Sequence, residues 1–176
     1  MESCNSIRTP LEAWLHLDKD GSGELVDAST YQSLVGSFRY FTSTRPDIAF
    51  GVGLISIFME TPRQAQWQAA KRILRYVKGT CNEGILYEAG DNKCNLVGFF
   101  DSDWAGNMED KKRTTSYVFH RGSGMIFWSS KKQQVVALST IEVEYMAATS
   151  CATQAVWLRR VLEEMNHKQA HPTMIF

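Results

Sequence analysis

The sequence lacks an excess of charge of either sign, because its 176 residues carry 19 Lys and Arg against 19 Asp and Glu. A single electrostatic field of one sign is therefore excluded. No apolar run approaches the about 20 residues that a membrane helix needs. The four cysteines form no CxxC pair, and no secretory leader precedes them. These absences predict reduced thiols, an intracellular location in the cytoplasm or nucleus, and no membrane partner.

The composition that remains is that of an ordinary globular protein. Hydrophobic residues make up 44% of the chain, aromatic residues 11% and charged residues 22%. Wholesale disorder is therefore excluded. The length fits one domain with an added helical piece.

The first half of the chain has apolar residues at helical spacing. Thr30 is predicted to cap a helix over residues 31–41. Pro46 suits the first turn of a second helix, and Asp47 complements the dipole of that helix. Its apolar run predicts that it is buried. A third helix is expected within residues 61–79, closed by its final glycine.

The second half changes to the alternating pattern of strands. Three strands are predicted, over residues 95–101, 116–120 and 125–129, and Arg121–Gly124 forms a hairpin turn between the last two. These strands form an antiparallel meander.

A long helix and one further strand follow the meander. Ser139 and Glu142 form a capping box for a helix that runs to about Met165. Residues 173–176 then predict a strand that returns to the sheet. Three antiparallel strands, a crossover helix and a returning strand describe an α/β layer with one mixed sheet.

Three acidic residues are candidates for metal chemistry. Asp101 ends an apolar strand, and Asp103 follows two residues later. Carboxylates hold divalent cations whose remaining ligands are substrate phosphates, although an Asp that begins a turn has the same pattern. Glu142 is explained by the capping box, whereas Glu144 has no such explanation. A Glu that faces solvent is the alternative for Glu144.

Basic residues gather in three places. The stretch from Arg63 to Lys78 has five basic residues and no acidic one. Such clusters fit phosphate contacts, but solvated faces have the same composition. The candidate nucleic-acid-binding residues are Lys71, Arg72, Arg75, Lys78, Lys111, Lys112, Arg113, Lys131 and Lys132.

Several motifs together resemble the polymerase polyprotein of copia-type retrotransposons, in order and over nearly the whole chain. They occupy Tyr31–Ser37, Thr44–Ile48, Lys71–Thr80, Asp101–Gly106, Trp128–Gln133 and Glu142–Tyr145. The resemblance implies a linker from the reverse transcriptase tail at residues 1–30, a helical connection segment at 31–80, and a ribonuclease-H-like domain at 94–176.

The same resemblance implies metal-dependent hydrolysis of RNA in RNA–DNA hybrids. Asp101 and Glu144 would be catalytic, and both would hold Mg²⁺ or Mn²⁺ together with Asp103. The family's third carboxylate, in a Cys-Asp-Asn motif, is expected directly after Phe176. A C-terminally truncated domain is therefore expected, with a weakly bound metal, if any, and impaired hydrolysis. The implied partners are an RNA–DNA hybrid or other nucleic acid and the remaining reverse transcriptase domains.

Two other classes of function fit part of the pattern. The chain could be a non-catalytic nucleic-acid-binding or scaffold remnant. It could also be a secreted effector, because residues 72–75 spell the string RxLR, although this string falls within a predicted helix and far from the N-terminus. Residues 18–29 begin like a calcium-binding EF-hand loop, but Ser29 stands where the closing Glu is required.

Overall fold

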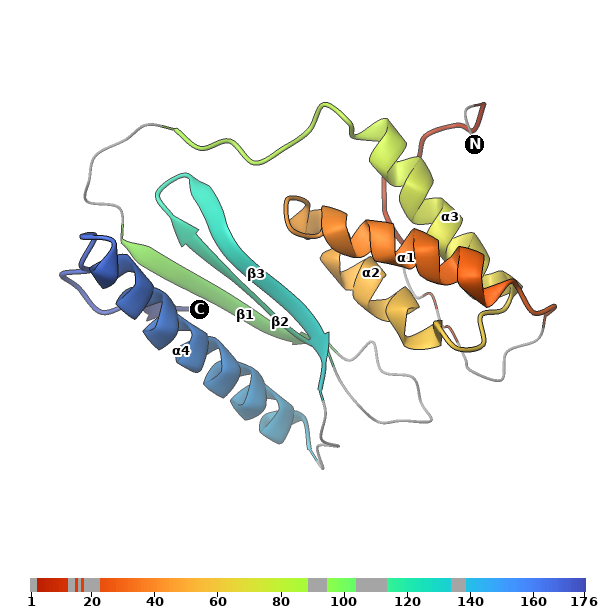
Figure 1. Cartoon of the computed structure of the whole chain (residues 1–176). Coiled ribbons are helices and arrows are strands. Elements are labelled where there is room, and N and C mark those ends of the chain that lie inside the picture. Colours follow the sequence, from red (N-terminus) through yellow and green to blue (C-terminus); the bar gives the residue numbers. More distant parts are fainter. Residues whose placement is uncertain are drawn as a thin grey trace. The chain divides into compact units, whose positions relative to one another are not determined.

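The structure, a computed structural model, describes residues 3–12, 15, 17, 23–88, 95–103, 114–133 and 139–176. The chain divides into two compact units, residues 1–84 and 85–176. The N-terminal unit is helical, and the C-terminal unit combines a sheet with a long helix (Figure 1). The protein is thus an α/β protein with four α-helices and a mixed four-stranded sheet in the described residues. No helix of those residues is long and apolar enough to cross a membrane.

The N-terminal unit contains the three helical segments that spacing predicts. They are α1 (Ala28–Phe41), α2 (Ala49–Ile55) between the short 3₁₀ turns η1 (Pro46–Ile48) and η2 (Ser56–Phe58), and α3 (Gln64–Gly79). Pro46 occupies the first turn of η1, as predicted, because its missing N–H needs no partner there.

The predicted cap of α1 is wrong. The helix begins at Ala28, and its N-cap is Asp27, whose carboxylate accepts hydrogen bonds from the Thr30 backbone N–H at 2.8 Å and from the Thr30 hydroxyl at 2.6 Å. Thr30 therefore lies inside the first turn. Either residue has a capping side chain, and the carboxylate prevails because it satisfies the backbone donor and the hydroxyl together.

The core of the N-terminal unit lies between its helices. Tyr31, Val35, Ile48, Ile55 and Ile73 are all fully buried there, which confirms that the apolar run through α2 is buried. The Tyr31 hydroxyl donates to the Ile55 carbonyl at 2.8 Å. Burial raises the pKa of Tyr31, so the hydroxyl remains a proton donor that ties α1 to α2.

The C-terminal unit has the predicted mixed sheet. Its elements are β1 (Leu96–Asp103), β2 (Thr114–Arg121), β3 (Gly124–Lys132), α4 (Thr140–Glu164) and β4 (Met174–Ile175). The strand order is β3-β2-β1-β4; β1, β2 and β3 are antiparallel, and β4 pairs in parallel with β1. The β2–β3 turn uses Gly122 at a φ of 64°, which glycine adopts without strain.

The crossover helix α4 begins where the capping pattern predicts. The Ser139 hydroxyl accepts a hydrogen bond from the Glu142 backbone N–H at 3.1 Å. The helix then follows β1 along one face of the sheet (Figure 1). Leu96 and Phe119 of the sheet pack there with Cys151 and Leu158 of α4 in a second buried core.

The sheet is closely packed under α4 at one glycine. A Cβ atom added to Gly98 would lie 2.7 Å from a ring carbon of Phe119, its neighbour across β1 and β2. The ring of Phe119 is fully buried. Gly98 therefore makes room for the largest side chain of this core.

Candidate functional site

The end of β1 and the start of α4 meet at the candidate acidic site. The Ser102 hydroxyl donates to a carboxylate oxygen (Oε1) of Glu144 at 2.7 Å. Glu144 is otherwise exposed. The end of β1 and the first turns of α4 are therefore in direct contact.

Asp101 is the neighbour of Ser102 in β1, but its side chain leaves the strand on the opposite face. Phe100 packs toward the α4 core, and Ser102 bonds to Glu144. Neighbouring side chains of a strand point to opposite faces. The exposed carboxylate of Asp101 therefore projects from the face opposite to the Ser102–Glu144 contact. A cation shared by Asp101 and Glu144 stays a prediction, and it requires the two carboxylates to meet around the strand end.

Other predicted acidic and basic residues fall outside the described part of the chain. These are the side chain of Asp103 and the residues Lys111, Lys112 and Arg113. Residues 18–22 of the EF-hand-like string also lie outside it, and Ser29 lies in the first turn of α1. Among the described residues, no group of three or more His, Cys, Asp or Glu side chains could hold a metal ion.

The basic residues of α3 contact their own chain. The Lys71 ammonium lies 5.0 Å from the centre of the Trp67 ring, a cation–π contact. Arg72 forms an ion pair with Glu12 at 2.8 Å and donates to the Thr9 hydroxyl at 3.0 Å.

Arg75 and Lys78 continue this row of contacts. Arg75 donates to the Asn5 carbonyl at 2.9 Å, and Lys78 donates to the Cys4 carbonyl at 2.9 Å. These contacts were not predicted. Their acceptors are mostly backbone carbonyls about 70 positions away, and a carbonyl carries no sequence signal.

The remaining basic candidates, Lys131 and Lys132, lie at the end of β3 in the C-terminal unit. They pair in register with Thr115 and Thr114 of β2. Because successive residues of a strand face opposite sides, the two lysines do not form one basic face.

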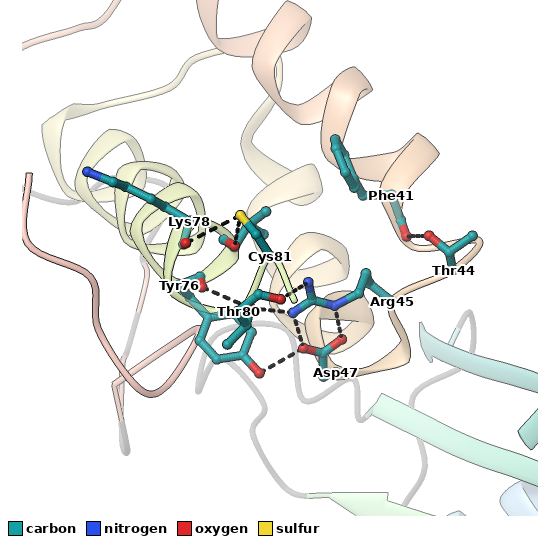
Figure 2. A network of polar contacts seen from close by, with 9 residues as sticks. Phe41, Thr44, Arg45, Asp47, Tyr76, Lys78, Thr80 and Cys81 are labelled. Atoms are coloured by element: carbon teal, nitrogen blue, oxygen red, sulfur yellow. Dashed lines mark hydrogen bonds and ion pairs between the residues drawn. The ribbon is translucent and has the colours of Figure 1, made fainter. Parts of the chain in front are cut away.

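A polar network that sequence reasoning missed joins the start of η1 to the end of α3 (Figure 2). The Arg45 guanidinium binds both carboxylate oxygens of Asp47, at 3.0 and 2.7 Å, and donates to the carbonyl and hydroxyl of Thr80 at 3.2 and 2.6 Å. Tyr76 donates its hydroxyl to Asp47 at 2.7 Å. The side chain of Arg45 is only 12% exposed.

The network favours the charged forms of Arg45 and Asp47 and the neutral form of Tyr76. Burial opposes ionisation of Asp47, but the hydrogen bonds from Arg45 and Tyr76 outweigh it, so the pKa of Asp47 is lowered. Burial and the hydrogen bond to Asp47 raise the pKa of Tyr76. Every strong donor of this network has an acceptor within the unit, which indicates a structural clamp.

Known proteins similar to this chain include Pol polyproteins of plant transposons. The retrovirus-related Pol polyprotein from transposon TNT 1-94 of Nicotiana tabacum is 39% identical over 96% of the chain and 13% of its own length. The corresponding polyprotein from transposon RE1 of Arabidopsis thaliana is 36% identical over 100% of the chain and 12% of its own length. The chain thus spans about an eighth of the length of these relatives.

The matches identify a retrotransposon-derived protein. More narrowly, the chain belongs to the family of copia-type retrotransposon Pol polyproteins, of which it covers one segment. No protein-family model and no solved structure matches it.

Another similar protein is named as a secreted effector and not as a Pol polyprotein. The secreted RxLR effector protein 161 of Plasmopara viticola is 45% identical over 73% of the chain and 90% of its own length. In the present chain the RxLR string, Arg72–Arg75, lies within α3, where Ile73 is fully buried and Arg72 binds Glu12. These four residues are part of a packed helix, so they are not presented as an extended motif.

Proposed function

We propose that the C-terminal unit is a ribonuclease-H-like domain whose ancestral chemistry is the metal-dependent hydrolysis of RNA in RNA–DNA hybrids. The activity of the chain by itself is impaired. The proposed partners are a hybrid duplex and the remaining reverse transcriptase domains of the polyprotein.

The contact between Ser102 and Glu144 carries this proposal. It brings the start of α4 to the strand end that holds Asp101, in a chain that belongs to the copia-type Pol family. The sheet order and the parallel β4 are compatible with a ribonuclease-H-like domain. Both acidic residues thus lie at one edge of the sheet. Glu144 approaches from the face that α4 covers, whereas the side chain of Asp101 projects from the opposite face.

The donor chemistry at this edge suits a hard cation. Carboxylate oxygens are the ligands that Mg²⁺ and Mn²⁺ prefer, and Asp101 and Glu144 would hold the ion. When bound, the metal would activate water and offset the charge that develops on the reacting phosphate oxygens. The Ser102 hydroxyl orients Glu144 by occupying one of its oxygens. The exposed Asp101 would supply the second carboxylate to the ion.

The same geometry supports the impairment. Two metal ions about 4 Å apart repel each other, and several carboxylates together with the phosphate must offset that repulsion. Among the described residues, two carboxylates occupy positions of the family's motifs, Asp101 and Glu144, and they lie on opposite faces of β1. One ion can be recruited there, but a clamp on both the attacking and the leaving oxygens is incomplete.

The chain by itself is therefore expected to cleave a labelled RNA–DNA hybrid little or not at all, with either Mg²⁺ or Mn²⁺. The assay includes Asp101→Asn, which keeps the shape of the side chain and removes its charge. Cleavage by the native chain that disappears in this variant would show a working site and contradict the impairment.

Metal binding tests the proposed chemistry independently of turnover. Titrated Mn²⁺ should broaden the amide NMR signals around residues 101 and 144, and Glu144→Gln should abolish this broadening. Glu164→Gln is the matched control, because Glu164 is an exposed glutamate at the far end of the same helix. Equal broadening in both variants, or none in the native chain, would count against the proposed site.

Non-catalytic binding of nucleic acid is a second candidate, and the basic row on α3 favours it. If Lys71, Arg75 and Lys78 all touch phosphate, replacing them with Gln should lower the slope of log affinity against log salt by roughly two to three. The slope is measured by fluorescence anisotropy with a labelled hybrid.

A control must remove three positive charges elsewhere. It combines Gln substitutions at three exposed basic residues, Arg39, Arg160 and Lys168. An equal drop in slope in both triple variants would mean that general charge, and not contact with α3, governs binding. If the salt slope of the α3 variant is unchanged, Lys71, Arg75 and Lys78 do not contact phosphate and belong to a structural or solvated face.

A further inference from the structure

The N-terminal segment of residues 4–12 lies along α3 and contacts its row of basic side chains. Four acceptors of this segment bind Arg72, Arg75 and Lys78: the Cys4 and Asn5 carbonyls, the Thr9 hydroxyl and the Glu12 carboxylate. We call residues 4–12 the strap.

The strap offers α3 the same chemistry as a phosphate backbone. Its acceptors are oxygen atoms spaced along one segment of the chain, and one of them is an anion. The three basic residues stand at every third position of the helix, so they follow one another along a single side with a rise of about 4.5 Å per step. A phosphate that approached these residues would need the positions that the strap oxygens occupy.

The strap is held closely at one point. A Cβ atom added to Gly79, at the end of α3, would lie 2.8 Å from the Ser6 Cβ, which is attached directly to the backbone of the strap. Ile7 and Leu11 pack against the core of the N-terminal unit as partly buried side chains. The docked position is therefore defined by packing as well as by hydrogen bonds.

The strap should nevertheless detach at a lower free energy than the helices unfold. No residue of 4–12 is fully buried, and the hydrogen bonds to Arg72, Arg75 and Lys78 are exposed. The Glu12 side chain is 63% exposed. Segments with few buried contacts and exposed hydrogen bonds open at low free energy.

We propose that the strap and nucleic-acid phosphates compete for Arg72, Arg75 and Lys78, so that the strap is an autoinhibitory contact that must leave before α3 binds nucleic acid. This inference rests on the proposed contact between α3 and nucleic acid. Competition lowers the apparent affinity by the fraction of molecules whose strap has left. By reciprocity, bound nucleic acid must also loosen the strap.

Gly79→Ala in the full chain tests the competition without removing any basic group. Its new Cβ pushes the strap away at Ser6, while the helical backbone accepts alanine. If the strap is docked in about nine molecules of ten, releasing it should tighten the binding of an RNA–DNA hybrid about tenfold, with the salt slope unchanged. The control is Gly36→Ala, since a Cβ there meets nothing within 4 Å.

A second variant releases the strap from its other end. Glu12→Ala combined with Thr9→Val removes both acceptors of Arg72 and should also tighten binding. Glu60→Gln removes one exposed negative charge from the same unit and serves as the control for net charge.

The position of the strap is measured separately, by the rate at which trypsin cleaves after the exposed Arg8. Gly79→Ala should accelerate this cleavage, and a saturating hybrid should accelerate it in the native chain. Tighter binding together with both accelerations supports the inference. Protection of Arg8 by the hybrid, or no acceleration in Gly79→Ala, overturns it.

The remaining outcomes separate the inference from the proposed function. Faster cleavage at Arg8 with unchanged affinity in both released variants overturns the competition and leaves the nucleic-acid contact intact. If neither the native chain nor a released variant binds the hybrid, the proposed contact is the part that fails, and the competition is overturned with it.

Discussion

Replacing Phe119 with alanine is expected to destabilise the C-terminal unit by about 3–5 kcal/mol. The ring is fully buried and fills the space above Gly98, between the sheet and α4. Its removal leaves a cavity between the sheet and α4, and the surrounding side chains relax into such a cavity only in part. Because small domains are stable by only about 5–15 kcal/mol, this loss should remove a large part of the unit's free energy of unfolding.

Urea denaturation followed by NMR measures this effect, because the chain has five tryptophans and their indole N–H signals can be followed one by one. Trp157, which contacts Phe127, reports on the C-terminal unit, and Trp67, which contacts Tyr31, reports on the N-terminal unit. Phe99→Ala is the matched control, because Phe99 is 42% exposed and its loss should cost far less. Equal costs for the two variants would show that the Phe119 core does not hold the unit together.

Replacing Asp47 with alanine is expected to destabilise the N-terminal unit by about 2–3 kcal/mol. The change leaves Arg45, which is only 12% exposed, without its bidentate partner, and it also removes the acceptor of the Tyr76 hydroxyl. A hydrogen bond to a charged group contributes about 1.5–3 kcal/mol, and the 36% exposure of Asp47 reduces the penalty of an isolated charge. The loss is measured by urea denaturation with the indole N–H signal of Trp67 as the reporter.

Tyr76→Phe separates the parts of this network. It removes one hydrogen bond and leaves the ion pair, so it should cost about 1.5 kcal/mol, the lower end for a hydrogen bond to a charged group, because the contact is only partly buried. A loss in Tyr76→Phe as large as that in Asp47→Ala would mean that the ion pair itself contributes nothing.

The network also gives the N-terminal unit a pH dependence with a defined sign. The pKa of Asp47 in the folded unit is lowered, and in the unfolded chain it is about 3.9. The contribution of Asp47 to stability is therefore fully present above the unfolded pKa and is lost as the pH falls through the lower, folded pKa. The difference in stability between the native chain and Asp47→Asn should shrink over this range. A constant difference would contradict the assignment.

Local patterns in the sequence predicted most of the secondary structure. The three N-terminal helices, the Ser139 cap and the hairpin turn at Gly122 all depend on side chains within a few positions of the backbone that they shape. The cap of α1 shows the limit of prediction from local patterns. Asp27 and Thr30 both carry capping side chains, and only their mutual hydrogen bond decides which one begins the helix.

The sequence predicted the two elements that carry the candidate acidic residues. The sequence placed Asp101 at a strand end and Glu144 in the first turns of a helix, and the crossover brings these elements together. It did not predict that Ser102 would take the position facing Glu144. A shift of one residue in a strand moves every side chain to the other face, and the packing of Phe100 under α4 decides that face.

The sequence by itself determined the family of this protein, the order of its helices and strands, and the residue types that chemistry requires. Only the tertiary structure decided what the charged groups contact. Arg72, Arg75 and Lys78 bind the strap, and Arg45 joins Asp47 to Thr80. The reason is physical: apart from Asp47, which is two positions from Arg45, these partners lie 35 to 74 positions from the cation, and many are backbone carbonyls. Every residue has such a carbonyl, so only the folded chain selects which one a cation meets.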